Sequence, residues 1–181
     1  MKNLILIRHA KSSWDDLALN DLERPLNKRG RREAPAMGRL LGEKGLLPDL
    51  ILSSPAKRAL KTAKLIAEEL GYPKKDIAIR ESIYEQDMKA MIGLISELDD
   101  KLKRVFLIGH NPVITELANR LTGGGIHDMP TCSIVSIEFS LPAWKQCAIG
   151  VGDVALFERP AKAKPTDDND EELPSDDIIG T

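Results

Sequence analysis

The chain begins with the stretch Lys2-Asn3-Leu4-Ile5-Leu6-Ile7-Arg8-His9-Ala10, in which an unbroken apolar run ends abruptly at an arginine and a histidine. A short apolar run bounded by polar residues is typical of a strand buried on both faces, as at the centre of a parallel sheet. In open α/β sheets, ligands bind just beyond the carboxyl ends of the strands. We therefore expect Arg8 and His9 to lie where a functional pair belongs, although the same pair could simply begin a solvated loop.

Length and composition predict one soluble domain. The chain has 181 residues, of which 42% are hydrophobic and 30% charged, as in ordinary globular proteins. No apolar run is long enough to span a bilayer, and residues 4–7 are too few for the core of a signal peptide, so we expect a cytoplasmic protein.

Cys132 and Cys147 are too few and too far apart for a disulfide framework or a thiolate metal site, so we expect both to be small buried or half-buried residues.

Charge is distributed unevenly between the body of the chain and its end. Residues 165–181 carry seven acidic and no basic residues, which leaves 26 basic and 21 acidic residues elsewhere and a net charge of about +5. A mildly basic body suits an anionic substrate. Aromatic residues make up only 4% and the lysines are scattered among acids, so we expect no nucleic-acid partner. We predict a domain over residues 1–159 and a disordered acidic tail over residues 160–181, which has too little apolar surface to bury.

Apolar runs alternate with helical patterns along the chain. Beyond the first strand, we expect strands at 49–53, 76–80, 104–108, 131–139 and 148–157, and helices at 27–44, 54–70, 88–98 and 111–121. Ser54-Pro55 and Asn111-Pro112 have the form of helix starts, with a capping side chain followed by proline in the first turn. We expect an irregular loop over residues 11–24 and a plain connection over residues 81–87. The alternation predicts an α/β fold with a mostly parallel sheet.

Three of the predicted strands end at basic or imidazole side chains. Arg8-His9, Arg58 and His110 each follow one of these strands, and parallel strands bring such residues to one edge of the sheet. Helices that start beside Arg58 and His110 would point their amino ends, which favour anions, at the same place. Arginine donors match the geometry of phosphate. The sequence therefore predicts a phosphate pocket that contains two histidines, whose rings should lie within about 8 Å of each other.

A histidine in this setting has a specific chemistry. Neighbouring arginines disfavour the protonated imidazole, so the pKa of His9 should fall and the neutral ring should be present near pH 7. A neutral ring nitrogen can attack phosphorus and form a phosphohistidine that water later hydrolyses. The arginines would stabilise the charge on the transferred group. This chemistry needs no metal and no cofactor.

Four groups of residues together resemble the histidine phosphatase superfamily, and within it the short SixA-type phosphohistidine phosphatases. They are Leu6-Ile7-Arg8-His9-Ala10, Arg24-Pro25-Leu26 with Arg29-Gly30-Arg31, Ser53-Ser54-Pro55 with Arg58-Ala59 and Thr62-Ala63, and Val105 to Pro112 with Gly109-His110-Asn111-Pro112. The resemblance implies a phosphoglycerate-mutase-like three-layer α/β/α sandwich. It also implies that His9 is the nucleophile, that Arg8, Arg58 and His110 hold the phosphoryl group, and that Arg24 is an added contact.

The chain departs from the family pattern at two places. Many members have glycine where this chain has Ala10, so a strained backbone there would cost more. Larger members also carry an insertion that covers the site and presents a catalytic acid, whereas only a short connection separates the third strand from the next helix here. Glu85 is the best candidate for an acid, followed by Asp87. An open site with weak acid assistance suits a phosphohistidine on a protein, because the P–N bond needs less help with its leaving group.

Other functions are compatible with the same residues. A broad phosphatase of small phosphorylated metabolites and a mutase of the same superfamily are the nearest, although the missing cover disfavours a dedicated mutase. A module that recognises phosphate without catalysis would have an identical site. A metal hydrolase built on His9, His110 and Glu85 is disfavoured, because the neighbouring arginines would repel a cation.

Overall fold

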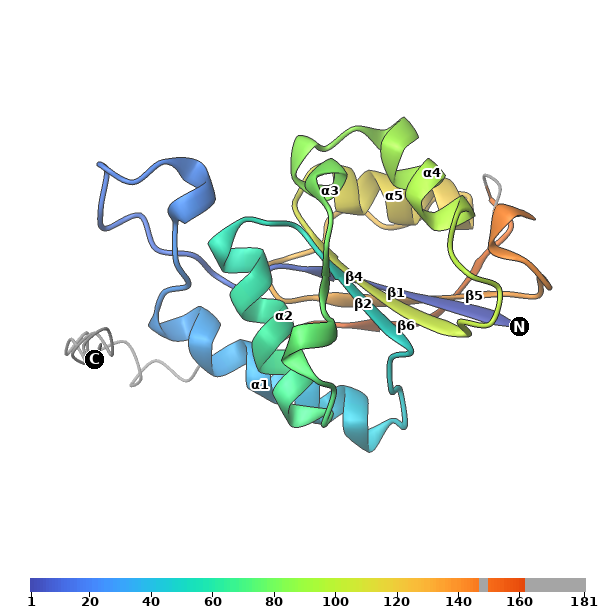
Figure 1. Cartoon of the computed structure of the whole chain (residues 1–181), viewed down its shortest axis with the longest axis horizontal. Coiled ribbons are helices and arrows are strands. Elements are labelled where there is room, and N and C mark those ends of the chain that lie inside the picture. The colour runs from blue at the N-terminus through green and yellow to red at the C-terminus, as the bar shows by residue number, and fades with distance from the viewer. Residues whose placement is uncertain (147–149, 162–181) are drawn as a thin grey trace.

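The computed structural model describes residues 1–146 and 150–161, which form a six-stranded sheet covered by helices on both faces (Figure 1). The strands are β1 (Lys2–Arg8), β2 (Leu50–Ser53), β3 (Ala78–Ile79), β4 (Arg104–Gly109), β5 (Ile134–Phe139) and β6 (Asp153–Glu158). The α-helices are α1 (Lys28–Glu43), α2 (Lys57–Glu69), α3 (Glu81–Glu85), α4 (Met88–Ser96) and α5 (Val113–Thr122). Short 3-10 helices are η1 (Asp21–Glu23), η2 (Lys74–Asp76) and η3 (Trp144–Gln146). This alternation confirms the predicted α/β class.

The order of the strands brings three strand ends to one edge. The sheet runs β3-β2-β4-β1-β5-β6. β1, β2, β3 and β4 are parallel, whereas β5 is antiparallel to both β1 and β6. Arg8 pairs with Gly109, and Ser53 pairs with Ile108. The last residues of β1, β2 and β4 therefore lie side by side, as expected for a mostly parallel sheet.

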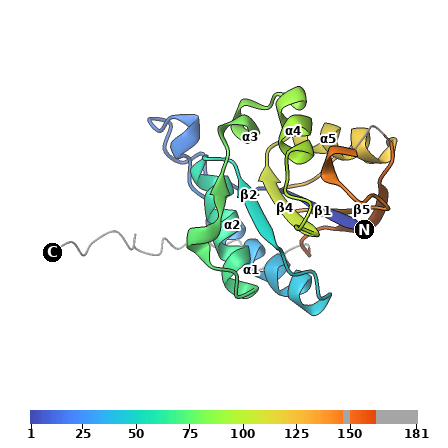
Figure 2. The ribbon, with the colours of Figure 1, turned by 45° about the vertical axis from the view of Figure 1, so that its right-hand side comes forward.

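Helices cover both faces of the central strand β1. Leu4 and Leu6 pack in a core shared with α4 and α5, whereas Ile5 and Ile7 pack in a core shared with α1 and α2. All four side chains have no exposed surface, which confirms a strand buried on both faces. Figure 2 shows α1 and α2 together on one side of the sheet and α4 and α5 on the other. The three-layer sandwich follows from this arrangement.

The two predicted helix starts are displaced by a few residues. α2 begins at Lys57 with Ala56 in the capping position, and α5 begins at Val113. The Ser54 hydroxyl accepts the Ala56 N–H but also bonds a histidine ring, and the Asn111 amide donates to the Asp128 carboxylate. Both predicted caps are therefore wrong, because these side chains hold neighbouring segments instead of the first turn of a helix.

Several predicted segments differ from the structure: the strand expected at 76–80 is only Ala78–Ile79, and the irregular loop expected over 11–24 contains η1. The strand expected from residue 131 starts at Ile134, because Cys132 has a φ of 62°, which no strand residue adopts. The strand expected from residue 148 starts at Asp153. The plain connection expected over residues 81–87 instead contains α3, which ends where Gln86 turns to a φ of 57°. α3 is too short to bury a long apolar face, so its sequence has little helical periodicity.

Backbone hydrogen bonds join the two ends of the polar loop between β1 and α1. Lys11 O accepts the Asn27 N–H at 3.0 Å, and Ser13 N donates to Pro25 O at 2.9 Å. Gly30 permits this closure, because a Cβ at that position would lie 2.2 Å from Lys11 O. The loop, drawn blue at the left of Figure 1, therefore returns to the sheet edge where β1 ends.

The remaining expectations concern the membrane, the cysteines and the tail. Within residues 1–146 and 150–161, no helix has the length and apolar character needed to cross a membrane. Cys132 is buried, as expected. Cys147 and residues 162–181, which make up nearly all of the predicted tail, lie outside the described residues. The predicted domain boundary at residue 159 stays a prediction.

Candidate active site

His9 follows β1 and is held by backbone atoms on both sides. Its N–H donates to Gly109 O on β4 at 3.0 Å, and its side-chain Nδ1 lies 2.7 Å from Ala10 O. A carbonyl oxygen only accepts hydrogen bonds, so Nδ1 carries the ring proton in the neutral imidazole. The lone pair of the neutral ring is therefore on Nε2. Only Gln86 and Cys132 have positive φ among the described non-glycine residues, so Ala10 causes no such backbone strain.

The second histidine lies beside the first. The ring centroids of His9 and His110 are 5.0 Å apart at an interplanar angle of 55°, which satisfies the expected limit of about 8 Å for two rings sharing one tetrahedral guest. Nε2 of His110 bonds the Ser54 hydroxyl at 2.7 Å. Its Nδ1 is buried and has no hydrogen-bond partner among the described atoms. A buried polar atom of this kind is normally satisfied by a ligand or by water.

Arg8 approaches the histidines from the last position of β1, and Arg58 approaches them from the first turn of α2. Nη1 of Arg8 donates to Met129 O at 2.8 Å, whereas its Nε is buried without a partner among the described atoms. Arg58 is only 6% exposed. Its charge and that of Arg8 both lower the pKa of His9, which places both guanidinium groups near that ring. The structure therefore brings these two predicted arginines together with the two histidines.

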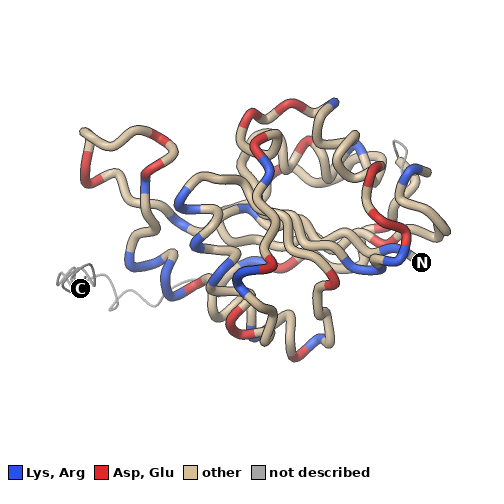
Figure 3. Tube along the Cα trace, in the orientation of Figure 1, with Lys and Arg blue, Asp and Glu red and all other residues tan. Residues whose placement is uncertain are grey.

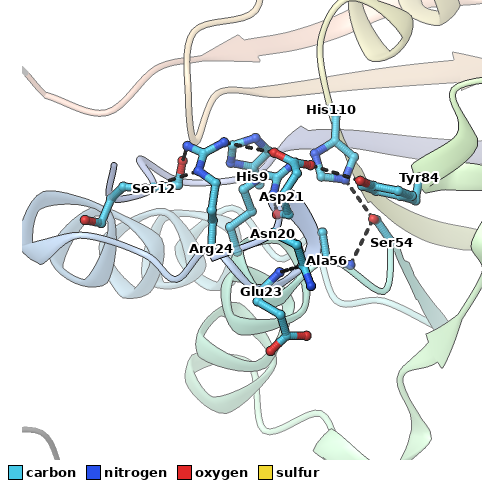
Figure 4. Close-up of polar contacts among 12 residues, drawn as sticks. His9, Ser12, Asn20, Asp21, Glu23, Arg24, Ser54, Ala56, Tyr84 and His110 are labelled. Atoms are coloured by element: carbon cyan, nitrogen blue, oxygen red, sulfur yellow. Dashed lines mark hydrogen bonds and ion pairs between the residues drawn. The ribbon is translucent and has the colours of Figure 1, made fainter. Parts of the chain in front are cut away.

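Arg24 reaches the same site from the polar loop. It is 7% exposed, and its Nη2 donates to the Ser12 hydroxyl at 2.7 Å while its Nε donates to Ser13 O at 3.2 Å. Its guanidinium carbon lies 3.2 Å from the centroid of the exposed Trp14 ring. The loop residues around Arg24 thus fix its position, as Figure 4 shows for the Ser12 contact.

A carboxylate absent from the predicted site lies among these cations. Asp21 accepts from Arg24 Nη1 at 3.0 Å, from Arg58 Nη2 at 2.9 Å and from the Tyr84 hydroxyl at 3.1 Å. Tyr84 belongs to α3, and its ring centroid lies 5.9 Å from that of His110. Figure 4 shows the bonds that join Asp21 to Arg24 and Tyr84. Its position in a loop without periodicity gave no signal beyond its spacing of three residues from Arg24.

Burial and positive charge keep both imidazoles neutral. Burial is the largest cause and lowers the pKa of His9 to about 3; the hydrogen bond to the Ala10 carbonyl is the next largest and opposes it, and the charges of His110, Arg58 and Arg8 lower the pKa further. Burial and Arg58 lower the pKa of His110 to about 4, although Asp21 acts in the opposite direction. The predicted decrease in the pKa of His9 is confirmed, but desolvation lowers this pKa more than the arginines do.

Glu85, the predicted acid, lies apart from these contacts. It is exposed at the end of α3 and forms no hydrogen bond or ion pair with the residues that the structure describes. Asp87 caps α4, where its carboxylate accepts the Lys89 N–H. The carboxylate that contacts the site arginines is Asp21, and a catalytic role for Glu85 stays a prediction.

The arrangement fits an anion. Two arginines, two neutral histidines and the amino end of α2 meet at one edge of the sheet, where forked N–H donors and the positive end of the helix dipole favour a phosphoryl group. Among residues 1–146 and 150–161, no three His, Cys, Asp or Glu side chains are grouped to hold a metal ion. Figure 3 shows basic and acidic positions interspersed along the trace, without a single basic stripe.

Sequence comparisons relate the chain to known proteins. The family model described as histidine phosphatase superfamily (branch 1) matches residues 4–104. An uncharacterized chloroplastic protein of Arabidopsis thaliana is 33% identical over 153 residues, which are 80% of this chain and 70% of that protein. A 2,3-bisphosphoglycerate-dependent phosphoglycerate mutase of Thermobifida fusca is 40% identical over 73 residues, which are 39% of this chain and 30% of the mutase. The chain thus matches less than a third of that mutase.

Solved structures share the fold at lower identity. The protein histidine phosphatase SixA complexed with tungstate has a TM-score of 0.74 and 22% identity, with 86% of this chain and 95% of that chain covered. The putative phosphohistidine phosphatase SixA from Agrobacterium tumefaciens has a TM-score of 0.74 and 24% identity, with 88% and 99% covered. A mycobacterial glucosyl-3-phosphoglycerate phosphatase has a TM-score of 0.67 and 16% identity, with 86% and 98% covered. These similarities identify the phosphoglycerate-mutase-like fold.

Proposed function

Because the chain belongs to the histidine phosphatase superfamily, we propose that it is a metal-independent phosphatase that acts on protein phosphohistidine through a phosphohistidine intermediate on His9. The observation that carries the proposal is the pairing of His9 with His110 at 5.0 Å, with Nδ1 of His9 bonded to the Ala10 carbonyl. This contact leaves Nε2 as the nucleophilic nitrogen. The low pKa of His9, about 3, keeps that nitrogen unprotonated at neutral pH.

In the first half of the reaction, the Nε2 lone pair of His9 attacks phosphorus. The bond between phosphorus and the substrate nitrogen breaks, and its electron pair stays on that nitrogen, so that a substrate ring protonated on its other nitrogen leaves as neutral imidazole. Arg8 and Arg58 stabilise the charge on the transferred phosphoryl oxygens, and Arg24 adds a further donor. His110 contributes its buried Nδ1, which has no partner among the described atoms. Water then hydrolyses the intermediate and releases phosphate.

We propose protein phosphohistidine as the substrate for two reasons: the segment beside the site is short, and an imidazole leaving group needs little acid assistance. Residues 80–103, between β3 and β4, hold only the short helices α3 and α4. Glu85, the predicted acid, has no described contact with the arginines or histidines of the site. An imidazole leaves phosphorus with less acid assistance than an alkoxide does. The SixA proteins that share the fold are named as histidine phosphatases, which supports the same substrate.

The test compares substrates with a matched pair of variants. The pure protein is incubated with a phosphohistidine carrier protein and with several small phosphate monoesters, with and without chelator. We expect the fastest release of phosphate from the carrier protein and no effect of the chelator. His9→Ala should lower the rate by at least about 10³-fold with an unchanged circular dichroism spectrum. The control is His127→Ala, which alters the third histidine of the chain, whose side chain is exposed.

Each of the other outcomes would overturn the mechanism or assign a different function to the chain. Full activity of His9→Ala overturns the mechanism. Faster turnover of a small monoester than of the carrier protein makes the chain a small-molecule phosphatase of the same superfamily. Binding of the phosphorylated carrier without turnover makes it a phosphate-recognising module.

A further inference from the structure

Asp21 contacts three elements of the site at once. Its carboxylate accepts from Arg24 beyond η1, from Arg58 in α2 and from Tyr84 in α3, at distances of 2.9 to 3.1 Å. Arg58 also donates to the main-chain oxygen of Asp21. Figure 4 shows the Asp21 carboxylate with its bonds to Arg24 and Tyr84, together with His9 and His110. An acidic side chain therefore holds the donors that the proposed phosphoryl group needs.

If Asp21 served only to stabilise the fold through ion pairs, its charge would oppose binding of the proposed phosphoryl group. A phosphoryl group bound by Arg58 and Arg24 places negative charge beside the Asp21 carboxylate, which repels it. The Asp21 side chain is 48% exposed, so water reaches it. The Asp21 carboxylate is thus accessible to solvent and competes directly with the proposed substrate for the same guanidinium groups.

The competition changes the basicity of Asp21 during the reaction. Burial raises the pKa of Asp21, but its bonds to Arg58 and Arg24 outweigh that effect and lower the pKa to about 2 in the free protein. Once a phosphoryl group on His9 takes these donors and adds its own charge, the carboxylate binds a proton more readily. Asp21 is ionised before the intermediate forms and becomes a stronger base when it has formed.

From these contacts we infer that Asp21 is the general base that activates water for hydrolysis of the phosphohistidine intermediate, a role that rests on the proposed function. The water oxygen bonds to phosphorus while the bond between phosphorus and Nε2 of His9 breaks, and the electron pair of that bond returns to Nε2. The Asp21 carboxylate takes one proton from the water. Hydrogen phosphate leaves, and Asp21 then passes the proton to solvent.

The test separates formation of the intermediate from its breakdown. With para-nitrophenyl phosphate, the leaving group needs no acid, so the first turnover reports formation and the later turnovers report breakdown. Asp21→Asn should release about one nitrophenolate per protein in a burst and then turn over on the order of 10²-fold more slowly than the unmodified protein. Quenched samples should contain acid-labile, base-stable phosphate on His9. Asp21→Ala should behave in the same way.

Two further carboxylates provide the comparison. Asp16→Asn changes an exposed acid of the same loop, whose carboxylate accepts only the Ala18 N–H among the described residues, and it should leave both phases unchanged. Glu85→Gln alters the acid expected from sequence. Accumulation of phosphoenzyme in Glu85→Gln but not in Asp21→Asn overturns the assignment.

The remaining outcomes distinguish this inference from the function on which it rests. If Asp21→Asn slows formation and breakdown equally, the residue only aligns the arginines and the inference is wrong. Equal breakdown rates in Asp21→Asn and the unmodified protein also overturn it, while the proposed function stands. Steady turnover without phosphate on His9 in either protein overturns both.

Discussion

The hydroxyl of Ser54 joins the end of β2 to the ring of His110, with Oγ 2.7 Å from Nε2. The same oxygen accepts the Ala56 N–H at 3.3 Å, which leaves the Ser54 proton available to Nε2. In that arrangement Nδ1 of His110 carries the ring proton and presents a donor, and this buried atom has no partner among the described residues. Ser54 therefore acts as a positioning residue that orients the ring of His110, and we expect its hydroxyl to favour this tautomer.

Ser54→Ala should lower kcat by about tenfold to a hundredfold, because a free imidazole ring is misplaced relative to the phosphoryl oxygens. Pre-steady-state measurement with para-nitrophenyl phosphate should place the loss in formation of the intermediate. The matched control is Ser53→Ala, since the Ser53 hydroxyl bonds only the Ser54 carbonyl among the described atoms. Equal rates for Ser54→Ala and Ser53→Ala would show that the contact does not orient the ring.

Sequence alone predicted the parts of the site that follow buried strands. Arg8, His9 and His110 come directly after apolar runs, and Arg58 lies in the helix that follows another. Because parallel strands end at a common edge, local patterns sufficed to bring these four residues together. The alternation of strands and helices also predicted the class of the fold, whereas the order of the strands came only from the structure.

The parts that sequence did not reveal depend on side chains without periodic patterns. Asp21 lies in a polar loop whose course is set by its closure on Lys11 and Gly30, and Tyr84 lies in a helix of five residues. Ser54 looked like a helix cap, but its hydroxyl bonds His110 across the sheet edge. Each of these contacts joins segments far apart in the chain, so nothing within a short window of sequence indicates them.

Gly30→Ala should destabilise the protein by about 1–3 kcal/mol, because the added methyl group would overlap Lys11 O at 2.2 Å. Gly42→Ala in the same helix is the matched control, since its nearest neighbour would be Leu70 Cδ2 at 3.4 Å. That substitution should stabilise the protein by up to about 1 kcal/mol through helix propensity. Urea unfolding measures both. A stable Gly30→Ala variant would contradict the close approach of α1 to the loop.

The free energy of unfolding should fall as the pH drops below about 6.5. His9 and His110 have pKa values of about 3 and 4 in the folded protein, so the unfolded chain binds protons in this range that the folded protein does not. The loss should begin near the unfolded pKa and reach on the order of 2 kcal/mol per histidine at about pH 5. Urea unfolding at about pH 7.5 and pH 5 measures it.

Three asparagine variants assign that pH dependence. His9→Asn and His110→Asn should each remove a large part of the difference between the two pH values, because each removes one group that must stay neutral in the folded state. His127→Asn should leave the difference unchanged, since His127 is exposed. The same pH dependence in all three variants would mean that other groups produce it.

Trp14 should report on binding of an anion through Arg24. The Arg24 guanidinium lies 3.2 Å from the Trp14 ring centroid and bonds Asp21, so a tetrahedral anion that draws Arg24 toward the histidines changes the surroundings of the indole. The second tryptophan, Trp144, is fully buried against Phe139. Titration with tungstate or phosphate should therefore change the tryptophan emission of the protein. The change should disappear in Trp14→Phe, whereas binding measured by calorimetry should weaken by no more than about fivefold, because an exposed cation–π contact contributes only about 0.5–1 kcal/mol. Retention of the emission change in Trp14→Phe would show that Arg24 stays in place when the anion binds.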